Sequence, residues 1–235
     1  MTLGCSAEKL PVLKAFDTGH NEYLLFQPRC KMWKCEYCAN INRLLWQAKI
    51  GHGYEYYTQS GIDGWNMLTI TAHPKCKTFE QCLFPWRNQW SKLGSRMRRK
   101  YPGFRYVILP ECHLDGRVHW HLVASGHIAN RWLKDNAASC GLGYMTTSEP
   151  VGKMEAAIGY VSKYISKSIY GNKWPKKLKR ISTSQKWPEL PPDENFVHLD
   201  VNWQYYLTYP QEGIGYLAHE LERETGIITR VLNPS

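Results

Sequence analysis

The segment that decides the fold reads Glu111-Cys-His-Leu-Asp-Gly-Arg-Val-His119-Trp-His121-Leu-Val-Ala. Apolar and polar residues alternate along its second half, and the Asp-Gly pair is typical of a tight β-hairpin turn. Side chains two apart on a strand share a face, so His119 and His121 lie side by side, and the turn brings Glu111 back beside them. Two imidazoles and a carboxylate form a ligand set suited to Mg²⁺ or Mn²⁺. An ordinary pair of half-buried histidines also fits this pattern.

A later segment, Met154–Tyr170, has the pattern of an amphipathic helix. Tyr160, Lys163, Tyr164 and Lys167 recur at i, i+3, i+4 and i+7, so they share one stripe that flanks the apolar face. Tyrosine becomes a useful nucleophile where a nearby cation or metal stabilises its phenolate. A helix whose tyrosines close the edge of the core and whose lysines are solvated explains the stripe as well.

Together, the two elements resemble the HUH endonuclease superfamily, in which His-hydrophobic-His lies on a strand and a nucleophilic tyrosine on a later helix. His119-Trp-His121 fills the metal motif, and Glu111 stands where such proteins often place a third ligand. Tyr160-Val-Ser-Lys and Tyr164-Ile-Ser-Lys both fit the Tyr-X-X-Lys pattern.

The order of the motifs is similar to that of the rolling-circle replication initiators (Rep proteins) of small single-stranded DNA phages and related plasmids. The run Asn66–Thr71 looks like their first strand motif, and the resemblance covers about residues 65–187. It implies an α+β fold, with a central five-stranded antiparallel sheet of the RNA-recognition-motif-like type flanked by helices.

The resemblance also implies a metal-dependent, site-specific endonuclease and strand transferase that nicks single-stranded origin DNA through a 5′-phosphotyrosine. His119, His121 and Glu111 would hold Mg²⁺ or Mn²⁺, Tyr160 or Tyr164 would attack, and the lysines of both motifs, listed last, would orient the phosphate. Tyr160 is slightly preferred as the first nucleophile because it lies further from the apolar face, and a second tyrosine would serve to close the displaced circle. The lysines are Lys163 and Lys167.

Two other functions remain open at this point. An HUH transposase or relaxase would use similar chemistry, although relaxases usually place the tyrosine before the histidines. A non-enzymatic, zinc-containing nucleic-acid-binding protein would need no covalent chemistry.

Composition agrees with a nucleic-acid partner. The 235 residues carry a formal net charge of +10, and clustered Lys and Arg gain affinity for phosphates by releasing counterions. Neither a membrane span nor a signal-peptide pattern is found, so we expect no membrane partner and a place in the cytoplasm of a host cell. No ATPase phosphate-binding motif is found either, so host polymerase and helicase are expected partners beside origin DNA.

A second metal site is predicted near the N-terminus. Cys30, Cys35 and Cys38 form a knuckle-like half-site for structural Zn²⁺, which takes tetrahedral thiolate ligands. The fourth ligand is open among Cys5, His20, His52 and Cys76, and three unmetallated cysteines are the alternative.

Basic residues cluster twice. The first cluster ends a helix, where it either contacts phosphates or complements the helix dipole, and consists of Arg98, Arg99 and Lys100. The second is a basic loop with aromatic residues that suits single-stranded DNA, with Trp174 or Trp187 stacking on a base, unless it is a solvated connection. Its candidates are Lys173, Trp174, Lys176, Lys177, Lys179 and Arg180.

The chain is expected to form one domain with additions: a cysteine-rich segment (residues 1–64) packed on the core, the endonuclease core (65–187) and an appendage (188–235). Expected strands are Glu22–Phe26, Trp65–Ala72, Tyr144–Ser148 and a stretch within Arg180–Trp187. Expected helices are Asn42–Ile50, Thr78–Arg99, Asn130–Ser139 and Gly215–Arg223.

Overall fold

The protein divides into two compact units, which we call the core unit (Trp46–Leu190) and the terminal unit (Met1–Leu45 with Pro191–Ser235). A computed structural model describes residues 10–28, 30–33, 35–113, 116–169, 179–191, 202, 204–208 and 213–232. The predicted packing of the two flanking segments on the core as one domain stays a prediction.

The core unit contains a five-stranded antiparallel sheet, which confirms the predicted α+β class. Its strand order is β6-β3-β5-β4-β7. The strands are β3 (Trp65–Thr71), β4 (Tyr106–Cys112), β5 (Val118–Ser125), β6 (Thr146–Pro150) and β7 (Ser182–Thr183). β6 begins two residues later than expected, and β7 is a short edge strand within the predicted stretch.

The β4–β5 hairpin forms as the alternating sequence predicts. Beyond the last ladder pair, the backbone N–H of His113 donates to the carbonyl of Arg117 at 2.8 Å. Gly116 adopts a positive φ of 82°, a conformation that glycine reaches without the steric cost of a Cβ. Leu114 and Asp115 lie outside the described residues.

One face of this sheet packs against α2 (Phe79–Lys100) and α3 (Asn130–Ser139). Trp120 of β5 points to this side and stacks on Trp86 of α2, with ring centroids 3.9 Å apart. α2 begins where the sequence predicts, because the Thr78 side chain accepts a hydrogen bond from the first turn.

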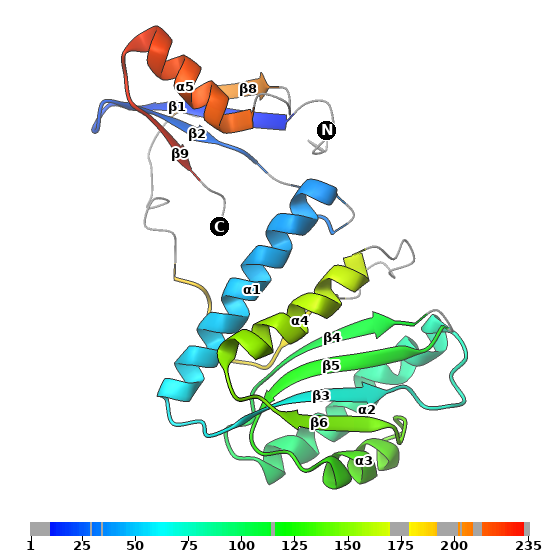
Figure 1. Ribbon diagram of the computed structural model, residues 1–235. Coiled ribbons are helices and arrows are strands. Elements are labelled where there is room, and N and C mark those ends of the chain that lie inside the picture. Colours follow the sequence, from blue (N-terminus) through cyan, green and yellow to red (C-terminus); the bar gives the residue numbers. More distant parts are fainter. Residues whose placement is uncertain are drawn as a thin grey trace. The chain divides into compact units, whose positions relative to one another are not determined.

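The opposite face packs against α4 (Met154–Ile169), as Figure 1 shows. Ala157, Val161 and Ile165 of α4 are fully buried, so the apolar face predicted from sequence is the one that packs. Residues 46–59 of α1 (Glu36–Gln59) contact α4 from outside, where Gln47 donates to the Ser162 hydroxyl at 2.7 Å. α1 is longer than predicted, and α4 ends just before Tyr170, which lies outside the described residues.

The terminal unit has a sheet of its own, which the sequence reasoning did not predict. Its strand order is β8-β1-β2-β9, and α5 (Gly213–Thr225) packs on it through a small core that includes Val12, Leu25 and Ala218 (Figure 1). The strands are β1 (Leu10–Asp17), β2 (Glu22–Phe26), β8 (Gln204–Thr208) and β9 (Thr229–Leu232). Only β2 and the helix were expected. Within the described residues, no helix is long and apolar enough to cross a membrane.

Candidate functional site

The site begins with the histidines of β5. His119 and His121 face α4, while Trp120 between them faces α2, as the period of two predicts. His121 is buried at 3% exposure, and the carboxylate of Glu111 on β4 is nearly as buried. Nε2 of His121 lies 2.9 Å from Oε2 of Glu111. The hairpin therefore brings the carboxylate beside one of the two histidines.

His119 is oriented differently. Its ring centroid lies 6.3 Å from that of His121, and it stacks on the ring of His113 at 3.9 Å. Nε2 of His113 in turn lies 3.6 Å from Oε2 of Glu111. In the described part of the chain, two groups of three residues have ligand atoms all within 4.8 Å of one another, and the Glu111 site is not one of them.

The sequence reasoning did not include His113 in the site. The available signal was its spacing, because Glu111 and His113 are two residues apart at the end of a strand and so tend to face the same side.

Tyr160 reaches into the sheet from α4. Its hydroxyl donates to the backbone carbonyl of Leu68 at 3.1 Å, and its oxygen lies 3.0 Å from both the Thr69 hydroxyl and Nδ1 of His121. The Thr69 hydroxyl also lies 3.2 Å from that Nδ1. Thr69 and His121 are direct cross-strand partners, so β3 supplies the third side of this cluster.

Tyr164 lies one helical turn further along α4. Its ring stacks face to face on the imidazole of His121, with centroids 3.4 Å apart and an interplanar angle of 11°. Lys163 is exposed, and its Nζ lies 5.6 Å from the centroid of the Tyr164 ring. The side chain of Lys167 lies outside the described residues.

Burial sets the ionisation of the cluster. Burial lowers the pKa of His121 to about 4, against the opposite effect of the Glu111 carboxylate, so its imidazole is neutral near pH 7. Burial also raises the pKa of the Tyr160 hydroxyl far above its usual range, although the hydrogen bond from Thr69 acts the other way.

The donor atoms around Glu111 fit a hard divalent cation. Two neighbouring ligands of an octahedral ion with bonds of 2.0–2.1 Å lie about 3 Å apart. The 2.9 Å between His121 Nε2 and Glu111 Oε2 matches that spacing, and both atoms are of the expected type. His119 lies on the same face and would complete the set after turning from His113.

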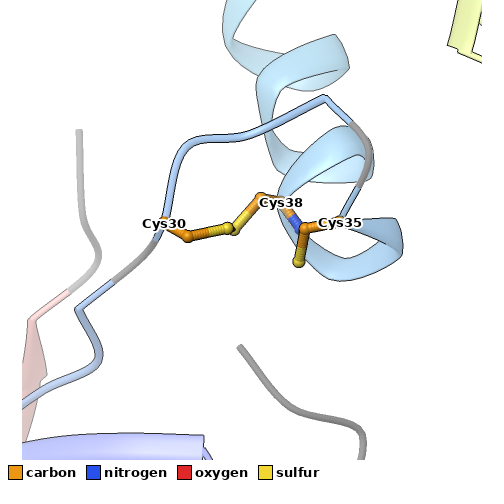
Figure 2. A group of neighbouring side chains, drawn as sticks. All are labelled: Cys30, Cys35 and Cys38. Atoms are coloured by element: carbon orange, nitrogen blue, oxygen red, sulfur yellow. The ribbon is translucent and has the colours of Figure 1, made fainter. Parts of the chain in front are cut away.

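The cysteines at the start of α1 form the second candidate metal site. Cys30, Cys35 and Cys38 have sulfur atoms within 4.8 Å of one another, and Figure 2 shows the sulfurs of Cys30 and Cys38 turned toward each other. Those two sulfurs are 3.4 Å apart, too far for a disulfide. Thiolates on one Zn²⁺ lie roughly 3.8 Å apart, given bonds of about 2.3 Å. The group could therefore form a zinc knuckle.

Two of the fourth-ligand candidates can be described further. His20 is engaged with Asp17, its Nδ1 lying 2.7 Å from Oδ2. It belongs to the other three-ligand group, with Asp17 and Glu22, and Glu22 also pairs with Arg230 at 2.6 Å. Cys5 lies outside the described residues.

The basic residues predicted to bind DNA are not all near the histidines. Arg98, Arg99 and Lys100 are exposed at the end of α2, which covers the opposite face of the sheet. The next residue, Tyr101, packs against Gly126 beyond the far end of β5, so the cluster also lies at the opposite end of that strand from His119.

The second basic cluster is described only at its end. Lys179 is exposed and Arg180 is half-buried, which lowers the pKa of the Arg180 guanidinium. Trp187 is buried and donates to the carbonyl of Lys49 at 3.0 Å, so it packs in the core unit and is not available to stack on a base. The other members, Lys173, Trp174, Lys176 and Lys177, lie outside the described residues.

The cluster of β3, β4, β5 and α4 is also the part of the chain that resembles known proteins. Residues 66–169 match a family model of replication-associated proteins, the ORF2 and gene-2-protein family. The matched segment begins on β3 and ends with the last residue of α4, so it contains Glu111, both histidines and both tyrosines. This likeness is consistent with a replication initiator. Comparisons with curated proteins and with solved structures found no match.

Proposed function

We propose that the protein is a replication initiator of the HUH type, a metal-dependent, site-specific single-stranded DNA endonuclease and strand transferase. The observation that carries the proposal is the contact of Glu111 and His121 with two tyrosines of α4. This contact lies within the segment that is similar to replication-associated proteins.

In this proposal Glu111, His121 and His119 hold the cation, with His113 beside the carboxylate. Bound there, Mg²⁺ or Mn²⁺ would supply Lewis-acid polarisation of the scissile phosphate. The buried carboxylate and neutral imidazole are suited to that task because neither needs to lose a proton near pH 7.

A tyrosine of α4 performs the chemistry. Its oxygen attacks phosphorus, the bond from phosphorus to the 3′ oxygen breaks, and the phenol proton passes through solvent to the released 3′-hydroxyl. The product is a 5′-phosphotyrosine, and attack by a 3′-hydroxyl on that bond rejoins DNA without a nucleotide cofactor. Exposed Lys163, beside Tyr164, orients the phosphate and balances its charge, and Lys167 from the second motif is assigned the same task.

The cysteine group is assigned a structural Zn²⁺ that holds the loop before α1 against the start of that helix. The loop is already closed on the helix by a hydrogen bond from Asn42 to the carbonyl of Lys31 at 3.0 Å. This group also favours the second candidate function, a zinc-containing nucleic-acid-binding protein without covalent chemistry.

A capture experiment separates the two functions. The full chain is incubated with a labelled pool of single-stranded DNA whose central segment is randomised, in Mn²⁺ and in EDTA, and products are resolved on a denaturing gel. We expect an adduct that survives denaturant, requires Mn²⁺, and disappears in the double variant Tyr160→Phe/Tyr164→Phe. Tyr56→Phe is the matched control, since Tyr56 is an exposed tyrosine of α1.

Sequencing the captured DNA would then give the recognition site. Tight binding of the pool without any adduct, in Mn²⁺ as in EDTA, would refute the nuclease and favour the binding protein. An adduct on DNA with a terminal inverted repeat of a mobile element or a conjugation origin would favour an HUH transposase or relaxase instead.

A further inference from the structure

The two tyrosines of α4 fit the same sequence motif but lie in different surroundings. Tyr160 is held through its hydroxyl, which touches three groups of the sheet. Tyr164 is held through its ring, which lies flat on His121. A residue held through its hydroxyl and a residue held through its ring are suited to different tasks.

The hydroxyl of Tyr160 has one proton, and that proton is donated to the carbonyl of Leu68. Its oxygen then accepts, and the two groups within reach are the Thr69 hydroxyl and Nδ1 of His121, each at 3.0 Å. To attack a phosphate, Tyr160 would have to give up all three contacts inside a largely buried cluster. The cost of leaving buried polar groups without partners opposes that movement.

The same contacts serve a metal ligand well. A histidine that binds metal through Nε2 must carry its proton on Nδ1, and such histidines almost always donate that proton to a fixed acceptor. Nε2 of His121 is the atom that faces Glu111, and Nδ1 faces Tyr160. A hydrogen-bonded chain therefore runs from the imidazole through the Tyr160 oxygen to the backbone of β3.

Tyr164 needs no such chain. Stacking uses the face of its ring, so the hydroxyl at the ring edge lies outside the stack. The exposed ammonium group of Lys163 lies on the neighbouring surface, 5.6 Å from the ring centroid. This arrangement places a phenol beside the His121 ligand and next to a cation that can meet phosphate.

We propose that Tyr160 is a positioning residue that orients His121 for metal binding, and that Tyr164 carries the nucleophilic hydroxyl. The assignment rests on the proposed function, because it divides the tasks of that site. In the covalent step the Tyr164 oxygen bonds to phosphorus, the 3′ oxygen leaves, and the phenol proton reaches it through water. The preference for Tyr160 drawn from helical phase is thereby reversed.

Two measurements on the full chain test the two halves separately. The first titrates Mn²⁺ alone, by calorimetry, into wild type, Tyr160→Phe, Tyr164→Phe and the control Tyr56→Phe. Loss of a group that supports a metal ligand typically weakens metal affinity 10–100-fold. Because Thr69 remains as a second acceptor, 3.2 Å from Nδ1, we expect about a tenfold loss for Tyr160→Phe. Adding Thr69→Val should enlarge the loss, while Tyr164→Phe and the control stay within about twofold of wild type.

The second measurement maps the adduct in wild-type protein, so it does not depend on any variant folding. The captured protein is digested, and the peptide that carries the nucleotide is sequenced by mass spectrometry. We expect the nucleotide on Tyr164. Tyr160→Phe should still form the adduct when Mn²⁺ is saturating, and Tyr164→Phe should form none.

The outcomes distinguish failure of the inference from failure of the proposed function. A nucleotide on Tyr160, or unchanged Mn²⁺ affinity in Tyr160→Phe, would overturn the inference while leaving the nuclease in place. Absence of any adduct in wild type would refute the proposed function and with it the role of Tyr164, and the calorimetry would still decide whether Tyr160 supports a metal ligand.

Discussion

The buried histidine of the site makes the core unit sensitive to acid in a way that can be calculated. His121 ionises near pH 6.5 when unfolded, whereas burial lowers its pKa to about 4 in the folded protein. Between these values the unfolded chain binds one more proton than the folded chain. The contribution of His121 to stability is therefore complete above about pH 6.5 and is lost as the pH falls toward 4.

The size of the effect follows from the two pKa values. At pH 5 the difference in proton binding lowers the free energy of unfolding by about 2 kcal/mol relative to neutral pH, and the limit at lower pH is about 3 kcal/mol. A loss of 2 kcal/mol is a large part of the stability of an ordinary domain. Replacing His121 with glutamine, which is polar but does not titrate, should remove this part of the pH dependence.

The assay is urea unfolding in EDTA at pH 7.5 and pH 5, read by hydrogen exchange of peptides from β4 and β5, so that the signal belongs to the core unit. The quantity compared is the change in unfolding free energy between the two pH values, in wild type and in His121→Gln. His127→Gln is the control because the His127 side chain is 70% exposed. Equal pH dependence in wild type and His121→Gln would refute the reasoning.

Three further predictions concern single residues. Cys38→Ser should cost the purified protein about one equivalent of zinc, measured by mass spectrometry of metals. Gly143→Ala should lower the free energy of unfolding by about 1–3 kcal/mol in urea titrations, because its Cβ would lie 2.3 Å from the Thr71 hydroxyl. Gly159→Ala, where a Cβ meets nothing within 4 Å, is its matched control. Asn66→Ala should lower the melting temperature, because the buried Asn66 amide donates at 2.9 Å to a serine of β6.

Each of these has a contrary result. Zinc retained by Cys38→Ser would remove the knuckle from the account. Equal destabilisation by the two alanine variants would mean that Gly143 is not held by close packing. An unchanged melting temperature in Asn66→Ala would mean that water replaces the amide at no cost.

Local patterns predicted much of the core unit. The expected range of α3 matches the structure, and the Thr78 cap was expected because both depend on residues close in sequence. The period of two along β5 likewise separated the two histidines from Trp120. The second sheet escaped prediction because β1 pairs with β8 from the other end of the chain, and no local pattern reports a partner so distant.

Sequence alone determined which chemistry the site can offer: the strand that carries the histidines, the helix that carries the tyrosines, and the hairpin that returns Glu111. These follow from residue type and from periods of two and 3.6, which depend on neighbouring residues only. Only the tertiary structure decided that His119 stacks on His113 and that Tyr160 bonds to the carbonyl of Leu68. Those contacts depend on how α4 packs across three strands, so two tyrosines with the same motif came to differ in their partners.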